Sequence, residues 1–276
     1  MLQVSGAALI ETVRGEEATR LFLSRTGMAR QASGVAFMRE LTRHLARFPY
    51  ENISKIIKNA GSAGPHQSMR FPLEVVDDHF GRNFGGTCFS LTFLLERMLT
   101  APGFDCYKVM ADMHMGPNVH CLVIVKECGA KYMIDPGYAL YEVIELPTRG
   151  RTTVTFPHAV VEIEREEDNR FRLWTEDASG RKWRYGFVDT PVREEDFEGY
   201  WIDSFTKPTL NNICLTMMTP QGHIYFRRDF FKFTSRGTIS KRRLKDGVES
   251  VIREEFGISG EWTELAQRLL MERRHT

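Results

Sequence analysis

The hydrophobic period of this chain changes near Phe104, and this change most constrains the fold. Before it, apolar residues recur at every third or fourth position, as expected for helices packed on one face. After it, short segments alternate between apolar and polar residues, and turn residues such as Gly129-Ala130 separate several of them. A run of helices followed by a run of strands predicts an α+β architecture.

The predicted elements fall into three groups. The first contains helices, at residues 17–25, 35–48, 72–80 and 88–99. The second contains strands, at residues 107–113, 119–126, 131–135, 152–156, 160–165, 170–175 and 182–187. The third is mixed, with helices at 193–202, 247–256 and 262–273 and strands at 213–218, 223–228 and 230–234. We therefore predict a helical bundle over residues 1–85, an antiparallel sheet or small barrel over 86–200, and a smaller α/β unit over 201–276.

The composition excludes several classes of partner. The 276 residues carry 37 basic and 36 acidic side chains, so no global field draws the protein to nucleic acid or to an anionic membrane. No apolar stretch approaches the roughly 20 residues of a membrane span, and residues 1–10 lack the basic start of an export signal. The five cysteines form no Cys-x-x-Cys pair, so no metal is expected, and a reduced cytoplasmic chain is the simplest interpretation.

Cys88 is the first candidate for chemistry. It follows Gly85-Gly86 at the predicted start of a helix, where free N–H groups and the helix dipole favour a thiolate over a thiol. The glycines allow a sharp turn and the close approach of a substrate. Taken alone, the same pattern also fits a cysteine that is merely packed in the core.

His120 and Asp135 stand at matching ends of two predicted strands. Those strands, 119–126 and 131–135, are joined by a tight turn, so both side chains should lie at one end of the sheet. Singly, the histidine fits a structural role and the aspartate a turn former. With Cys88 on a helix packed against the sheet, the three instead form a nucleophile, a base and an orienting carboxylate, in the chain order of papain-like and transglutaminase-like cysteine enzymes.

The motifs around these residues resemble the arylamine N-acetyltransferase family. Pro49-Tyr-Glu-Asn-Ile53 resembles the family's Pro-Phe-Glu-Asn-Leu, and Gly85-Gly-Thr-Cys-Phe89 resembles its Gly-Gly-x-Cys-Phe. His120 stands where the family has a histidine that opens a strand, and Ile134-Asp-Pro-Gly-Tyr138 resembles Val-Asp-x-Gly-Phe. Two weaker ones, Thr219-Pro-Gln-Gly222 and Phe256-Gly-Ile258, resemble motifs of the family's tail. The likeness extends from about residue 20 to about residue 260.

The resemblance implies a fold and an activity. The fold is a helical bundle, a β-barrel and an α/β lid around a cysteine-protease-like core. The activity moves an acetyl group from acetyl-CoA to the thiol of Cys88, and then to an arylamine, arylhydroxylamine or hydrazine. His120 and Asp135 complete the implied catalytic residues. The implied coenzyme contacts are Gly116, Pro117 and Gly137, and the implied contacts to the acceptor are Tyr50, Phe84, Val119 and Tyr138.

The chain departs from the family pattern around this site. Phe84 stands where the family has arginine before the glycines, with Arg82 nearby but out of register, and Ser90 follows Cys88-Phe89 where glutamate or glutamine is usual. Ala139 replaces a glycine, and residues 207–210 replace a Ser-x-Phe-Thr stretch. The hydroxyls of Tyr50 and Tyr138, where the family has phenylalanine, either alter the choice of acceptor or occupy tolerant aromatic positions.

Two other functions stay open at this stage. One is an amide synthase of the same fold that takes its acyl group from a carrier protein, and the other is a relative that binds without turnover. Pro117 and Pro136 lack N–H groups that a pyrophosphate would use, so weak binding of acetyl-CoA is expected. The basic run 241–245 fits a solvated face better than a phosphate site. The sequence does not indicate an oligomeric state.

Overall fold

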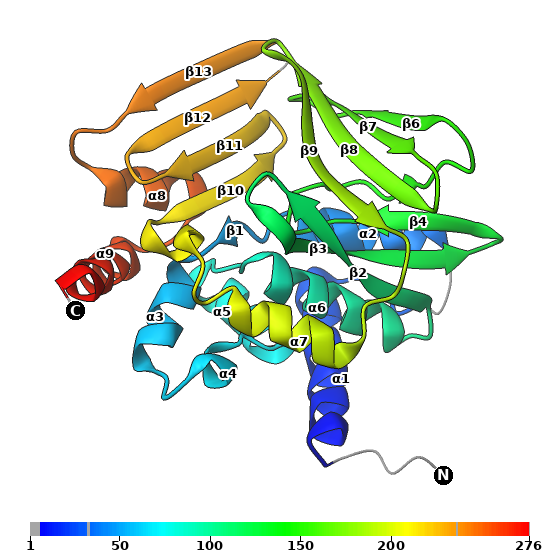
Figure 1. The fold of residues 1–276 in the computed structure, drawn as a ribbon. Coiled ribbons are helices and arrows are strands. Elements are labelled where there is room, and N and C mark those ends of the chain that lie inside the picture. The colour runs from blue at the N-terminus through cyan, green and yellow to red at the C-terminus, as the bar shows by residue number, and fades with distance from the viewer. Residues whose placement is uncertain (1–5, 32–33, 236, 276) are drawn as a thin grey trace.

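The computed structural model describes residues 6–31, 34–235 and 237–275. Two antiparallel sheets stand side by side above a layer of helices (Figure 1). The first five residues, part of the stretch for which the sequence predicts no export signal, lie outside the described residues. Within the described ranges, no helix is long and apolar enough to cross a membrane.

The helical layer is built from the first hundred residues. Its helices are α1 (Gly6–Thr26), α2 (Val35–Leu45), α3 (Ile53–Gly61), α4 (Pro65–Ser68), α5 (Pro72–Arg82) and α6 (Cys88–Thr100). The predicted start of α6 at Cys88 is confirmed, and nearly all of its residues are buried, as its apolar pattern predicts. Helix α2 ends at Leu45, three residues before the predicted end at Phe48. Helix α3 was not predicted, although Ile53, Ile56 and Ile57 follow helical spacing.

The larger sheet has eight strands in the order β5-β4-β3-β2-β9-β8-β7-β6. Its strands are β2 (Asp105–Met113), β3 (Gly116–Glu127), β4 (Ala130–Ile134), β5 (Ile144–Glu145), β6 (Arg151–Thr155), β7 (Val160–Arg165), β8 (Arg170–Asp177) and β9 (Gly180–Val188). The sheet curls until its edge strands β5 and β6 come into contact, which makes a nearly closed barrel around an apolar core. The predicted α+β class with a central antiparallel barrel is therefore confirmed.

The smaller sheet has five strands in the order β1-β10-β11-β12-β13. Its strands are β1 (Tyr50–Glu51), β10 (Cys214–Thr219), β11 (Gly222–Arg227), β12 (Phe230–Ser235) and β13 (Thr238–Arg243). Strand β1 comes from the helical part of the chain and pairs with β10, so this sheet joins distant segments. Strand β13 was not predicted because it contains the basic run; its exposed Lys241, Arg242 and Arg243 charge an edge that would otherwise be free to pair.

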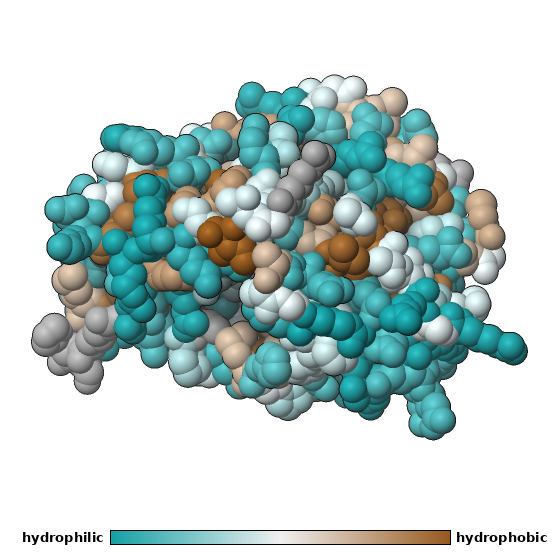
Figure 2. All heavy atoms as spheres, turned by 90° about the horizontal axis from the view of Figure 1, so that it is seen from above, coloured by the Kyte–Doolittle hydropathy of each residue, from teal (hydrophilic) through white to brown (hydrophobic). Residues whose placement is uncertain are grey.

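Four more elements link and cover the sheets: α7 (Glu194–Asp203), the 3-10 turn η1 (Pro208–Asn211), α8 (Val248–Phe256) and α9 (Gly260–His275). Helix α7 packs on α6 through Phe197 and Trp201, which contact the rings of Phe89 and Phe93. On the face above the sheets, hydrophobic residues reach the surface in small groups between hydrophilic ones (Figure 2). The division of the chain at residues 85 and 200 stays a prediction.

Candidate active site

Cys88 occupies the first position of α6, directly after a turn that only glycine can make. A Cβ on Gly85 would lie 1.9 Å from the carbonyl oxygen of Pro49, so the chain passes too close to β1 for any side chain. Gly86 is fixed by two backbone hydrogen bonds, one donated to Pro49 (3.3 Å) and one accepted from Glu51 (3.0 Å). The sulfur of Cys88 is nearly buried and lies 3.8 Å from the carbonyl oxygen of Val119.

His120 and Asp135 meet beside this sulfur, as the hairpin predicts. His120 lies on β3, and Asp135 is the first residue after β4. The Nε2 of His120 is 2.7 Å from Oδ2 of Asp135, and both side chains are buried. His120 also interacts with Cys88, and each side chain shifts the pKa of the other towards its charged form, so the ring links the sulfur to the carboxylate. The structure therefore brings together the three residues that the sequence predicts to be catalytic.

Asp135 is held by two further donors. The backbone N–H of Tyr138 donates to its Oδ1 (2.8 Å), and the hydroxyl of Tyr185 on β9 donates to its Oδ2 (2.6 Å). Tyr185 is fully buried. Sequence reasoning missed this residue, although a tyrosine on a strand that faces the core needs a partner for its hydroxyl. With both oxygens occupied, the carboxylate cannot turn away from His120.

The charges of this cluster favour a thiolate opposite an imidazolium. Hydrogen bonds from Cys121 and His120, together with the positive charges of His120 and Lys55, hold the pKa of Cys88 well below its usual range, although burial opposes them. Burial alone would lower the pKa of His120, but Asp135 and Cys88 raise it to about 10. The positive imidazolium and the thiolate thus stabilise each other.

Gly137 lies between the two reactive side chains. A Cβ there would be 2.6 Å from the Cβ of Cys88 and 3.2 Å from Cε1 of His120. Any larger residue would push the sulfur and the imidazole apart, which gives a physical reason for glycine at this position. Its predicted contact with a coenzyme stays a prediction.

Lys55 is a second residue that sequence reasoning missed. It lies on α3 and is almost completely buried, with its ammonium donating to Oγ (2.5 Å) and to the carbonyl (3.2 Å) of Ser204. The same ammonium lies 4.1 Å from the centre of the Phe205 ring. Burial lowers the pKa of Lys55 to about 8, and the nearby Cys88 thiolate opposes that shift. A lysine followed by an isoleucine in a helix gives no sequence signal of such a location.

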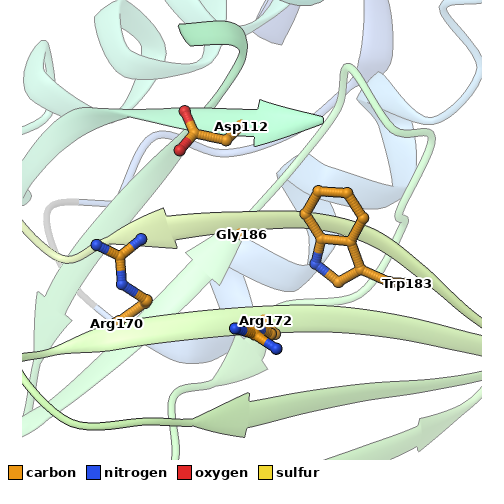
Figure 3. Close-up of a pocket in the computed structure, with 5 residues that line it drawn as sticks. All are labelled: Asp112, Arg170, Arg172, Trp183 and Gly186. Atoms are coloured by element: carbon orange, nitrogen blue, oxygen red, sulfur yellow. The ribbon is translucent and has the colours of Figure 1, made fainter. Parts of the chain in front are cut away.

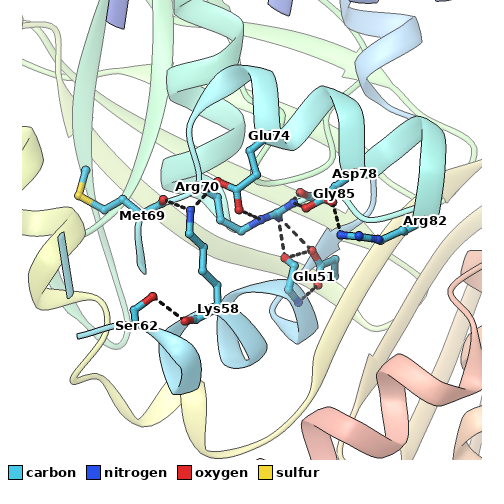
Figure 4. A network of polar contacts seen from close by, with 10 residues as sticks. Glu51, Lys58, Ser62, Met69, Arg70, Glu74, Asp78, Arg82 and Gly85 are labelled. Atoms are coloured by element: carbon cyan, nitrogen blue, oxygen red, sulfur yellow. Dashed lines mark hydrogen bonds and ion pairs between the residues drawn. The ribbon is translucent and has the colours of Figure 1, made fainter. Parts of the chain in front are cut away.

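Arg70 places a cation beside the glycine turn, where Phe84 supplies none. Its guanidinium donates to the carbonyl oxygen of Gly85 (2.7 Å) and to Oγ of Ser54 (2.6 Å), and lies 3.6 Å from Oε1 of Glu51 (Figure 4). Both Arg70 and Glu51 are buried. Arg82, the residue near the expected position, instead pairs with Asp78 at 2.7 Å and is half exposed. The cation beside the glycine turn is thus Arg70, which lies just before α5. Its distance from Gly85 in the sequence gives no indication of this contact.

The four residues predicted to contact the acceptor make different contacts. Val119 contacts Cys88 through its carbonyl oxygen, and Tyr138 lies with its ring centre 6.2 Å from that of His120. Burial and the Cys88 thiolate raise the pKa of Tyr50 well above its usual range. Phe84 is buried against the ring of Trp262 on α9, with centres 5.9 Å apart. Their contact with an acceptor stays a prediction.

Gly116 and Pro117 open β3, in the hairpin that leads to His120. The next residue, Asn118, donates its N–H to Oδ1 of Asp112 on β2 (3.0 Å). The predicted contact of Gly116 and Pro117 with a coenzyme stays a prediction. Among the residues that the structure describes, no group of three or more His, Cys, Asp or Glu side chains is arranged to hold a metal ion.

The fold belongs to the cysteine-protease-like class, in which a helix carrying a cysteine packs against a sheet. A family model described as N-acetyltransferase matches residues 35–264, and the chain therefore belongs to the arylamine N-acetyltransferase family. The resemblance inferred from the motifs is confirmed. The chain matches none of the curated proteins.

Solved structures of the family share this fold. The arylamine N-acetyltransferase of Mycobacterium abscessus is 20% identical, with a TM-score of 0.78 over 92% of this chain and 96% of that one. That of Nocardia farcinica is 21% identical, with a TM-score of 0.76 over 90% and 93%. A Bacillus cereus enzyme described as having a Cys-His-Glu catalytic triad is 15% identical, with a TM-score of 0.67 over 88% and 98%.

Proposed function

We propose that this protein transfers an acetyl group from acetyl-CoA, through a thioester on Cys88, to an aromatic amine, hydroxylamine or hydrazine. The observation that carries the proposal is the buried chain of contacts from the Cys88 sulfur through His120 to Asp135. Membership of the arylamine N-acetyltransferase family supports the choice of donor and acceptor. The proposal includes a cytoplasmic setting, because the thiol must stay reduced to act.

The chemistry proceeds in two balanced steps. The Cys88 thiolate attacks the thioester carbonyl of acetyl-CoA, a C–S bond forms to Cys88, and CoA leaves as its thiol with the proton from His120. The amine then attacks the acetyl-cysteine, His120 takes the proton that the amine loses, and the Cys88 thiolate leaves. Asp135 keeps the imidazole in place throughout, with its own orientation fixed by Tyr138 and Tyr185.

Mass spectrometry of the protein after incubation with acetyl-CoA tests this proposal. We expect one added acetyl group, mapped to the peptide that contains Cys88 and removed on addition of 4-methoxyaniline. A Cys88→Ser variant should acquire no adduct, and Asp135→Asn should fold but form the adduct orders of magnitude more slowly. If no CoA thioester acylates Cys88 while that thiol still reacts with iodoacetamide, the donor is a carrier protein and the proposal is wrong.

A further inference from the structure

A pocket of about 290 Å³ opens on the outer face of the barrel, away from the buried sulfur. It is lined by Asp112 on β2, Arg170 and Arg172 on β8, and Trp183 and Gly186 on β9 (Figure 3). The pairing register creates it. Gly186 stands opposite Asp112 on one side and opposite Arg172 on the other. Because neighbouring strands are about 4.8 Å apart and Gly186 has no side chain, a slot about 10 Å wide lies between Asp112 on one side and Arg172 on the other.

The two arginines that form the basic wall of this slot have guanidinium nitrogens available to bind a ligand. Within the described part of the chain, the guanidinium of Arg170 makes no hydrogen bond or ion pair, and the side chain is exposed. Arg172 uses its Nε to pair with Glu166 at 3.0 Å, which leaves its terminal nitrogens available. Two guanidinium groups two residues apart on one strand face the same side. Such a pair suits the oxygens of a phosphate.

The far end of the slot is aromatic and carries an unused donor. The Nε1–H of Trp183 is shielded from solvent and has no hydrogen-bond partner among the described residues. Figure 3 shows this nitrogen turned toward the arginine side of the pocket. The ring of His114 packs at a right angle against Trp183, with centres 4.5 Å apart. Opposite, Asp112 uses Oδ1 to accept the N–H of Asn118 and keeps Oδ2 available as an acceptor.

The slot continues toward the candidate active site. A second hollow of about 250 Å³ shares Asp112 and Arg170 and extends to Asn118 and to Tyr200 of α7. Asn118 directly precedes Val119, whose carbonyl oxygen contacts the Cys88 sulfur. The carboxylate of Asp196 also lines this hollow, but Arg193 pairs with it at 2.6 Å and offsets its charge. A long ligand can therefore lie with one end in the slot and the other at the hairpin beside Cys88.

We propose that this slot, defined by Asp112, Arg170, Arg172, Trp183 and Gly186, binds the phosphorylated adenosine end of the acyl-CoA donor. This inference rests on the proposed function. The adenine stacks on Trp183, the phosphates contact Arg170 and the terminal nitrogens of Arg172, and Oδ2 of Asp112 accepts a hydrogen bond from the nucleoside. Pro117 and Pro136 remove backbone donors near Cys88, so the arginines supply the phosphate contacts that those loops lack.

A comparison of two donors tests the slot. Acetyl-CoA carries the nucleotide and acetyl-pantetheine does not, so loss of a nucleotide contact must affect only the first. Arg170→Met and Trp183→Leu should each raise KM for acetyl-CoA about tenfold, with KM for acetyl-pantetheine and kcat unchanged. A matched control on the same outer face is Arg151→Met, because Arg151 is exposed, pairs with Glu162 and lies outside the slot. This control should leave both KM values unchanged.

Two results would overturn the inference. One is an unchanged KM for acetyl-CoA in both slot variants, and the other is an equal rise for both donors, which would indicate a general distortion of the barrel. If neither donor acetylates Cys88 in the unaltered protein, the proposed function fails separately. The slot is then judged by calorimetry with adenosine 3′,5′-bisphosphate: weaker binding to Arg170→Met than to Arg151→Met supports it, and equal binding contradicts it.

Discussion

Cys121, and to a smaller extent Lys55, lower the pKa of Cys88 in addition to His120. The thiol of Cys121 has a pKa raised well above its usual range, mainly by burial, so it stays protonated and donates to Cys88. Lys55 contributes a buried positive charge, and its pKa of about 8 means that this contribution fades above that pH. At the scale of one residue, the reactivity of the nucleophile therefore depends on two side chains outside the predicted catalytic set.

Lys55→Met should make Cys88 a weaker nucleophile. Without the ammonium the thiolate loses a favourable charge, so the pKa of Cys88 rises and less thiolate is present at mildly acidic pH. The rate of alkylation by iodoacetamide, followed against pH, should shift to higher pH, and Lys55→Arg should restore part of the shift. An unchanged profile in Lys55→Met would show that the ammonium has no influence on the sulfur.

The other cysteines provide the internal control for that measurement. Burial raises the pKa of Cys106 to about 12 and that of Cys214 to about 11, so neither should react at mildly acidic pH. Cys128 is exposed and is best removed by substitution beforehand. We expect peptide mapping to find Cys88 labelled first. Earlier labelling of Cys106 or Cys214 would contradict the nucleophilic role of Cys88.

At the scale of an element, Arg70 stabilises the turn that begins α6. Arg70→Met would leave the carboxylate of Glu51 buried without its cation, and removing one partner of a buried pair typically costs about 3–5 kcal/mol. Adding Glu51→Gln should recover part of this cost, because the group left behind is then uncharged. The test is to measure the free energy of unfolding in urea for both single variants and for the double variant. An interaction between the two side chains makes the double variant less destabilised than the sum of the single variants. Simple additivity would mean that the two side chains act independently.

The hairpin between β3 and β4 offers a stabilising substitution. Cys128 and Gly129 both have positive φ, at 50° and 79°, as in a two-residue turn of type I′. Cysteine is strained in that conformation and asparagine tolerates it, so Cys128→Asn should raise the free energy of unfolding by about 1 kcal/mol. The hairpin tip lies at the opposite end of β3 from His120, so acetyl transfer should not change. Equal or lower stability in urea would contradict the argument.

Local sequence patterns predicted the helices and strands whose apolar residues recur at a regular spacing. They missed the contacts between residues that lie far apart in the sequence. The start of α6 could be predicted from Gly85-Gly86, and the meeting of His120 with Asp135 from a short hairpin. Strand β13 was missed because it lies at an exposed sheet edge, where charged side chains replace the alternating apolar residues of a buried strand. The contact of Arg70 with Gly85 joins a loop to a turn 15 residues away, and no spacing rule specifies it.

At the scale of the whole molecule, two neutral histidines connect the barrel to the five-stranded sheet. His158, in the loop between β6 and β7, stacks on His223 of β11 with ring centres 5.0 Å apart, and His223 contacts Oγ1 of Thr216 through Nε2. Burial, together with Lys232 and Arg184, lowers the pKa of His158 to about 4 and that of His223 to about 3, with Asp177 opposing the shift of His158. Both sheets therefore pack most favourably when this pair is uncharged.

The protein should consequently lose stability on mild acidification. The unfolded chain takes up protons near the ordinary histidine value of 6.5, whereas the folded pair resists until about pH 4, so the free energy of unfolding falls as the pH drops between those values. His158→Asn combined with His223→Gln should reduce this fall, measured as the difference between urea midpoints at about pH 7 and about pH 5. Burial also lowers the pKa of His79 to about 4. Because His79 remains in the variant, some decrease of the free energy of unfolding with falling pH should persist. An equal fall in both proteins would show that the pair does not couple protonation to the packing of the two sheets.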